Sequence, residues 1–220
     1  MNRRHHLALA GLAGALALSI GYAQAKPKSK PASGTQITQN DVRICMGVDG
    51  STPDDQIPVC TKILNSGKVK APHTGDFYAT RAAAYFAKND LDKAMADLNK
   101  AITIRQAPEF YFQLGMVNMS MRNLDAAKAD MGQVMKLKPD FSPPYLMRGL
   151  ISYNSAEYAE ALPFFDGAVQ RNPTYYQALF ARGATKKKLG DVDAGEKDIA
   201  EARGMSNKVD DIMKGLGVRP

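Results

Sequence analysis

Arg81 and Arg182 are each followed, 16 residues later, by an aspartate, Asp97 and Asp198. If the two residues of a pair stand on neighbouring antiparallel helices, this separation brings a guanidinium group against a carboxylate, which is the arrangement of a bidentate ion pair. An ion pair inside each helical hairpin is therefore the structural interpretation. The functional alternative is a row of arginines that binds an acidic ligand.

Arg148 has the same place in the pattern, 34 residues before Arg182, but Phe164 stands where the aspartate would be. An arginine without an internal carboxylate can bind an acidic group of another molecule. Arg148, with Lys187 and Lys188, is therefore our candidate for a polar ligand contact. The lysines have a structural alternative, because cations near the end of a helix stabilise its dipole.

Catalytic and metal-binding patterns are scarce in the chain. After the N-terminal leader, the only histidine is His73, in the segment KAPHTGD, which we expect to be an exposed linker. A lone histidine supports neither a histidine-based metal site nor a Ser-His-Asp arrangement. Asp49, Asp54 and Asp55 lack the order of a calcium-binding loop, and helix capping explains them. Since glycine-rich phosphate and dinucleotide motifs are also absent, we expect no enzyme activity, no cofactor and no metal.

Cys45 and Cys60 are the only cysteines. An even number of cysteines in an exported protein favours a disulfide bond. This bond would close the loop MGVDGSTPDDQIPV and add about 3 kcal/mol through loop-closure entropy. The alternative is a pair of separate buried thiols. A redox-active pair is more often spaced Cys-x-x-Cys, a pattern that the chain lacks.

The first 25 residues have the three parts of a secretory signal peptide. Arg3 and Arg4 supply the positive start, Leu7–Ile20 is an apolar run, and residues 23–25 (AQA) fit a small-x-small cleavage site. The apolar run is shorter than the roughly 20 residues of a membrane span. We expect cleavage after Ala25, export to the periplasm and no stable membrane insertion. An uncleaved N-terminal anchor is the alternative.

The charge of the remaining chain is nearly balanced. Removing Arg3 and Arg4 from the 29 basic residues leaves 27 against 22 acidic residues, a net charge of +5. Three of these charges lie in the Lys/Pro/Ser-rich segment 26–40, which has little to bury and should be a flexible tether. No basic stripe with interleaved aromatic residues is visible, so we expect no nucleic-acid partner.

Residues 41–74 should form an N-terminal cap. Thr52, Pro53 and Asp54 give a typical helix start, with a hydroxyl group, an early proline and early acids, and the helix should end at Gly67. One helix cannot bury its own apolar side, which includes Ile57. It should therefore pack on the segment that follows.

From Gly75 onward, one pattern recurs: an apolar helix, a short polar turn and a second helix with small residues. Small residues mark the same place in each second helix, with spacings of 33, 34 and 34, at Ala94, Ala127, Ala161 and Gly195. Such a period predicts stacked helical hairpins, each covered by the next. We place the units at 75–107, 108–141, 142–175 and 176–203, followed by a C-terminal capping helix and tail at 204–220.

Two residues break this pattern. Pro163 lies inside the second helix of the third unit and should delay its start or kink it. Gly195 replaces the usual alanine and should weaken the fourth unit by about 1 kcal/mol. We therefore expect the C-terminal end of the array to fray first.

Leu114-Gly115, Ala127 and Pro139 match the pattern of the tetratricopeptide repeat, a 34-residue helix-turn-helix unit with an aromatic residue, Leu-Gly, a mid-unit alanine and a closing proline. The chain resembles this family from Gly75 to about Arg203, although three units have arginine where the family often has leucine. The resemblance implies an all-α, right-handed solenoid of about four units, whose first helices line a concave inner face.

On this resemblance, eight apolar residues of the first helices are expected to line a groove: Phe86, Phe112, Met116, Met119, Leu146, Leu150, Tyr153 and Phe180. Flexible methionines and large apolar side chains suit an amphipathic helix or an extended peptide. The Lys, Asn and Arg residues of the subtype that holds a C-terminal carboxylate are mostly absent. For Met116, Met119 and Leu150, packing in the core is the alternative.

Together these patterns predict a non-enzymatic protein-interaction module, a scaffold or assembly factor of the cell envelope that binds a partner peptide or helix. One alternative is an accessory or substrate-holding subunit of an envelope enzyme complex. Another is self-association through the groove.

Overall fold

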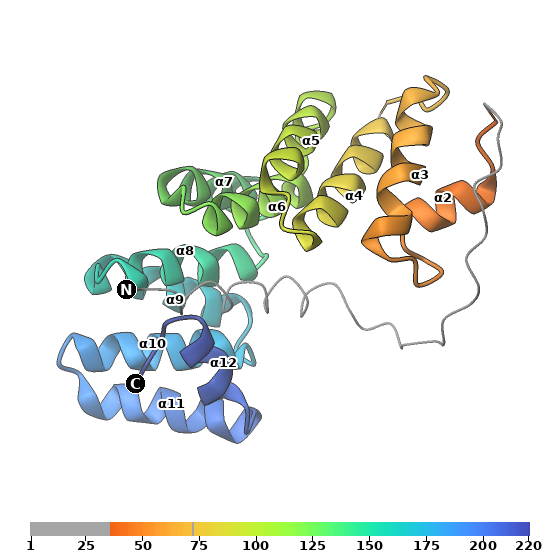
Figure 1. The fold of residues 1–220 in the computed structure, drawn as a ribbon. Coiled ribbons are helices and arrows are strands. Elements are labelled where there is room, and N and C mark those ends of the chain that lie inside the picture. The colour runs from red at the N-terminus through yellow and green to blue at the C-terminus, as the bar shows by residue number, and fades with distance from the viewer. Residues whose placement is uncertain (1–35, 72) are drawn as a thin grey trace, which may run out of the picture. The chain divides into compact units, whose positions relative to one another are not determined.

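A computed structural model describes residues 36–71 and 73–220, so the expected signal peptide and most of the expected tether lie outside it. Within these residues all regular structure is helical, in eleven helices, α2 to α12 (Figure 1). This confirms the all-α fold. None of the described helices combines the length and apolarity needed to cross a membrane.

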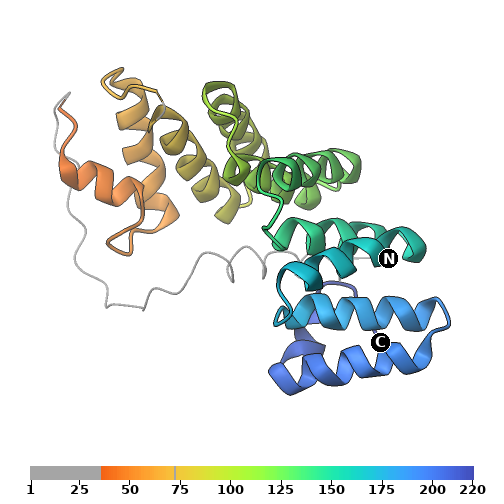
Figure 2. The ribbon, with the colours of Figure 1, turned by 180° about the vertical axis from the view of Figure 1, so that it is seen from behind.

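The described chain divides into two compact units on either side of the boundary between Asn123 and Leu124. The N-terminal unit contains α2 (Gln39–Cys45), α3 (Pro53–Asn65), α4 (His73–Ala87), α5 (Leu91–Ile104) and α6 (Pro108–Ser120). The C-terminal unit contains α7 (Leu124–Leu137), α8 (Pro143–Asn154), α9 (Tyr158–Arg171), α10 (Tyr176–Lys188), α11 (Val192–Met205) and α12 (Val209–Gly215). Within each unit, helices that follow one another in the sequence pack side by side (Figures 1 and 2).

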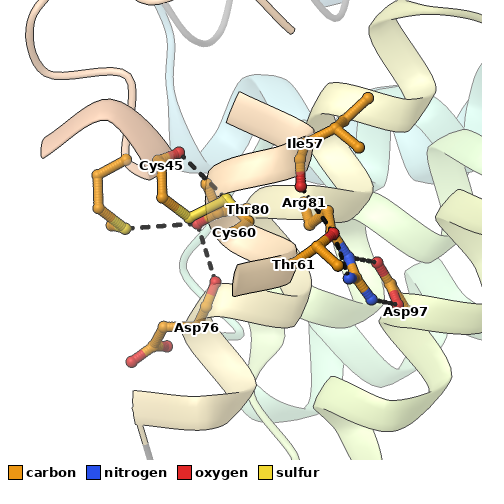
Figure 3. The surroundings of a disulfide bond; sticks show 9 residues. Cys45, Ile57, Cys60, Thr61, Asp76, Thr80, Arg81 and Asp97 are labelled. Carbon is orange, nitrogen blue, oxygen red and sulfur yellow. Dashed lines mark hydrogen bonds and ion pairs between the residues drawn. A yellow bond between two sulfur atoms is a disulfide. The ribbon is translucent and has the colours of Figure 1, made fainter. Parts of the chain in front are cut away.

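The first two helices are capped and cross-linked. Thr38 precedes α2, and its backbone N–H donates to Asp41 Oδ2 at 2.7 Å, while Asp41 N–H donates to Thr38 Oγ1 at 3.1 Å. This reciprocal capping box starts the helix at Gln39, two residues before the expected boundary. Cys45 at the end of α2 and Cys60 in α3 form the disulfide bond, with their Cα atoms 5.0 Å apart (Figure 3).

The disulfide lies in a small apolar cluster that joins the cap to the repeats. Both cysteines and Ile63 of α3 are fully buried there, together with Phe77 of α4. The cap therefore packs against α4. This agrees with the expectation that the cap helix, which cannot bury its own apolar side, packs on the segment that follows. The expected helix start is also confirmed, since Thr52 N–H donates to Asp55 Oδ2 at 3.2 Å and α3 begins at Pro53.

The expected small residues are the points of closest approach between helices. Ala82, Ala94 and Ala101 are fully buried in the core that α4, α5 and α6 share, with Leu98 and Phe110 beside them. Small side chains let the helix axes approach, and the large residues then fill the gaps between them.

In the C-terminal unit, glycines serve the same purpose. A Cβ atom on Gly149 of α8 would lie 2.5 Å from Phe165 Cε1 of α9, so the phenyl ring occupies the space that glycine leaves. A Cβ on Gly195 of α11 would lie 2.6 Å from the carbonyl oxygen of Gly183 in α10. The expectation that Gly195 only weakens the helix is therefore incomplete, because α10 and α11 can approach this closely only without a side chain there.

The turns inside the helical hairpins share one conformation. Asn89, Arg122, Ala156 and Gly190 have left-handed φ angles of 59°, 65°, 61° and 97°. After α8, for example, Ala156 N–H donates to Tyr153 O and Glu157 N–H to Ser152 O, both at 2.9 Å. This is the Schellman motif, which satisfies the last carbonyl groups of a helix and reverses the chain.

Two local expectations need correction. Pro163 does not delay the start of its helix, because α9 begins at Tyr158 and continues through the proline to Arg171, and a kink at the proline stays a prediction. His73 is not part of a linker, since it is the first residue of α4, where the side chain is exposed and Nδ1 lies 3.7 Å from Asp76 Oδ2.

Candidate functional site

Arg81 pairs with Asp97, as the 16-residue spacing predicted. Its Nε and a terminal nitrogen donate to the two carboxylate oxygens at 2.7 and 2.8 Å, which is a bidentate ion pair between α4 and α5. The other terminal nitrogen donates to Thr61 Oγ1 of α3 at 2.8 Å (Figure 3). The hydrogen bonds to Asp97 raise the pKa of Arg81. This side chain therefore fixes three helices to one another and is not free for a ligand.

Arg182 repeats the arrangement between α10 and α11. Its Nε and one terminal nitrogen donate to the two oxygens of Asp198 at 2.7 Å each, and Lys186 Nζ donates to the same carboxylate at 2.8 Å. Burial acts to raise the pKa of Asp198, but the hydrogen bonds from Arg182 and Lys186 outweigh it, so that the pKa lies below its ordinary value. The structural interpretation is thus confirmed for both aspartates.

Arg148 differs, as its sequence context indicated. Its guanidinium group stacks over the ring of Phe164, with Cζ 4.6 Å from the centroid, and its buried Nε has no hydrogen-bond partner among the described residues. The missing aspartate is therefore replaced by a cation–π contact. A contact between Arg148 and an acidic group of another molecule stays a prediction.

The two lysines proposed with Arg148 have different surroundings. Lys187 forms an ion pair with Glu196 of α11, and the hydrogen bond from Lys187 lowers the pKa of that glutamate. Lys188 is exposed at the end of α10. Lys187 thus has a structural role in the hairpin, while Lys188 remains a candidate contact.

The eight expected groove residues divide by unit and by burial. Phe86 on α4 and Phe112 on α6 belong to the N-terminal unit and are partly exposed. The other six are buried: Met116 and Met119 on α6, Leu146, Leu150 and Tyr153 on α8, and Phe180 on α10. All eight residues lie on the first helices of their hairpins, as expected.

On α6, apolar residues occupy more than one face. Phe110, Leu114 and Val117 belong to the core shared with α4 and α5, whereas Phe112, Met116 and Met119 do not. A helix that is apolar around its circumference needs a second cover besides its own core. Of the expected groove residues of the N-terminal unit, Phe86 packs against this core, while Met116 and Met119 are buried on another side of α6.

On α8, the last turn contacts the end of the chain. Tyr153 Oη donates to the backbone carbonyl of Arg219 at 2.9 Å, and Asn154 Nδ2 donates to that of Leu216 at 3.0 Å. Burial raises the pKa of Tyr153. Asn154 and this C-terminal contact are absent from the sequence predictions. The available signal was Gly217 followed by Val218, which is typical of a helix end whose next residue packs inward.

Two segments of the chain match a known repeat family, and the matches begin and end near the predicted unit boundaries. Residues 75–108 and 108–141 both match the tetratricopeptide repeat family. Residues 75–141 carry two tetratricopeptide repeats. The matched segments agree with the first two predicted units, and the hairpins α8–α9 and α10–α11 have the same turn geometry. Tetratricopeptide repeats act in general as scaffolds for protein interaction, through surfaces that successive repeats extend.

One related protein is human tetratricopeptide repeat protein 6. It is 26% identical over 108 residues, which are 49% of this chain and 21% of the relative. The chain thus spans about a fifth of the length of this curated relative.

Solved structures share the tetratricopeptide repeat fold over most of the chain. A crystal structure of MamA has a TM-score of 0.67 at 18% identity, covering 79% of this chain and 97% of MamA. MamA from Desulfovibrio magneticus RS-1, residues 41 to the end, has a TM-score of 0.67 at 12% identity, covering 77% and 95%. YrrB, a TPR protein with an unusual peptide-binding site, has a TM-score of 0.62 at 16% identity, covering 81% and 88%.

Proposed function

We propose that this chain is an exported, non-catalytic interaction module whose first helices bind a segment of a partner protein. The observation that carries the proposal is the set of large apolar side chains on α6, Phe112, Met116 and Met119, of which the two methionines are buried. Phe86 of α4 and Phe112 remain partly exposed.

The chemistry of these side chains favours a peptide or an amphipathic helix as the ligand. Methionine side chains are flexible and polarizable and adapt to differently shaped apolar groups, while aromatic rings offer large contact areas. A helix or an extended peptide with apolar anchors would supply the complementary surface. A peptide ligand for a repeat array of this fold also agrees with the description of YrrB.

Export through a cleaved N-terminal signal is part of the proposal. The disulfide bond between Cys45 and Cys60 supports it, because such bonds persist in oxidising compartments such as the bacterial periplasm.

The test compares three proteins in a cross-linking and capture experiment with cell-envelope extract. The double variant Phe86→Ser, Phe112→Ser removes the partly exposed rings, whereas Val192→Ser removes an apolar side chain of α11 that is 51% exposed. Leu150 is unsuitable, because it is 2% exposed and a polar replacement would test folding.

We expect the unmodified chain and Val192→Ser to capture the same partner, and the double variant to lose it while its circular dichroism stays helical. If all three folded proteins capture the same partners, the apolar face of α4 and α6 is not the binding surface.

A further inference from the structure

The last five residues of the chain, 216–220, here called the tail, lie against the last turn of α8. Tyr153 and Asn154 donate the two hydrogen bonds that hold the tail, at 2.9 and 3.0 Å. Val218 is fully buried and Leu216 nearly so. The helix that leads into the tail, α12, packs against α10 (Figures 1 and 2).

A Schellman motif aims the tail at α8. Gly217 has a left-handed φ of 82°, and the N–H groups of Gly217 and Val218 donate to Lys214 O at 3.1 Å and Met213 O at 2.9 Å. This turn ends α12 and points Val218 inward. It also leaves the carbonyl groups of Leu216 and Arg219 free to accept from α8.

The contacts of the tail are those of a peptide ligand. Both hydrogen bonds from α8 go to backbone carbonyl oxygens, which any peptide offers. Selectivity comes from the glycine, because a Cβ on Gly217 would overlap Asn154 Oδ1 and would lie 3.2 Å from Asn154 Cγ. The buried Val218 adds a requirement for an aliphatic residue directly after the glycine.

The tail can leave without removing α12. Val209 and Met213 of α12 are fully buried. The Arg203 guanidinium of α11 also makes a bidentate pair with Asp210 of α12, at 2.9 and 2.7 Å. These contacts precede the tail in the sequence, so α12 has its own attachment to the hairpin.

We propose that the surface around Tyr153 and Asn154, here called the tail site, is a peptide-binding site that the tail of this chain occupies in the resting state. Its external ligand is an extended peptide with an aliphatic–Gly–aliphatic sequence, which displaces the tail. This proposal rests on the function proposed above and gives the C-terminal unit a second site of its own, in addition to the apolar residues of α6 in the N-terminal unit.

The experiment uses a fluorescent peptide with the sequence of residues 213–220, MKGLGVRP, and measures its binding by anisotropy. Three forms of the full chain are compared: unmodified, Gly217→Ala, and Gly204→Ala. Gly217→Ala should expel the tail and keep the tail site, because the left-handed φ of 82° and the overlap with Asn154 both oppose a side chain there, whereas Gly204 is an exposed glycine of α11 whose added Cβ would meet nothing within 4 Å. A fourth protein ends at Gly215, and a control peptide has alanine in place of the second glycine.

Removal of the resident tail should lower the apparent dissociation constant of the peptide at least about tenfold for Gly217→Ala and for the shortened chain. Gly204→Ala should bind like the unmodified chain, and the alanine peptide should bind none of the proteins. Adding Asn154→Ala to the shortened chain should weaken binding again.

Equal binding of the peptide to all folded forms would overturn the proposal, and so would loss of helical circular dichroism in both Gly217→Ala and the shortened chain, because the tail would then be part of the core. A concentration-dependent dimer of the unmodified chain in sedimentation, dissolved by excess peptide, would replace it with exchange of tails between copies. If the Phe86→Ser, Phe112→Ser variant loses the envelope partner but the peptide experiment fails, the proposed function stands and the tail site does not.

Discussion

Asp198 receives hydrogen bonds from two cations, Arg182 and Lys186, and its side chain is almost completely buried. Replacing it with asparagine leaves both cations facing a neutral amide. Since breaking a buried ion pair from one side typically costs about 3–5 kcal/mol, we expect Asp198→Asn to destabilise the C-terminal unit by roughly that amount at pH 7. Chemical denaturation measures this loss.

The same residue gives an acid dependence. The pKa of Asp198 is lowered in the folded protein, so its contribution is present above the unfolded pKa, near about 3.9, and is lost as the pH falls through the lower folded pKa. As the pH drops below 5, the free energy of unfolding of Asp198→Asn should therefore fall less steeply than that of the unmodified chain. Asp166→Asn is the control, because Asp166 is 53% exposed and 3.5 Å from Arg182, and it should cost less than about 1 kcal/mol.

Gly195 shows how packing can outweigh helix propensity. Alanine normally stabilises a helix by about 0.5–1 kcal/mol relative to glycine. At Gly195, however, the new Cβ would lie 2.5 Å from Lys187 Cγ and 2.6 Å from Gly183 O. We expect Gly195→Ala to lower the free energy of unfolding by about 1–3 kcal/mol. Gly204→Ala in the same helix meets open space and should be neutral or stabilising; a stabilising Gly195→Ala would refute the close approach.

At the scale of elements, the turn between the helices of a hairpin is the most uniform part of the chain. Ala156 adopts φ 61° there, where a Cβ is unfavourable, and Gly190 takes the equivalent place with φ 97°. Ala156→Gly should therefore stabilise the protein by up to about 1 kcal/mol. Gly190→Ala should destabilise it by a similar amount, because its Cβ would meet nothing within 4 Å and only the backbone conformation would change. Thermal unfolding should give a higher Tm for Ala156→Gly and a lower Tm for Gly190→Ala than for the unmodified chain.

The α2–α3 cap should depend on its covalent bond. The disulfide closes a 15-residue separation between Cys45 and Cys60, for which loop-closure entropy suggests about 3 kcal/mol. Hydrogen exchange with and without reductant should show faster exchange in α2 and α3, with α8 to α11 unchanged. Equal exchange in α3 under both conditions would mean that the apolar cluster around Phe77 holds the cap by itself.

At the scale of the whole molecule, the sequence predicts that the exported protein begins at Lys26. Mass spectrometry of the exported chain should give this N-terminus. Ala25→Arg should block cleavage by removing the small residue at the cleavage site, while Gln24→Ser should be processed normally. Detection of an exported chain that retains residues 1–25 would favour the uncleaved anchor.

Features that depend on the repeat period could be predicted from the sequence, and others could not. A helical hairpin fixes the separation between facing residues, so the Arg81–Asp97 pair followed from spacing alone. Periodicity does not distinguish an apolar residue in a groove from one under a cover, which is why the burial of Leu150 had to come from the structure. Likewise, the close contact between Gly183 of α10 and Gly195 of α11 could not be predicted from the spacing and is known only from the structure.

The tail also bears on the order in which the chain acquires its structure. Most packing contacts of the chain join helices that follow one another in the sequence, and such contacts can form while a chain is being made. The hydrogen bonds from α8 to the tail instead span 66 and 62 residues. They need residues 216–219, so a chain that stops at Gly215 would contain all the described helices and would lack both hydrogen bonds. The tail contact can therefore form only after the helices that it joins have been made.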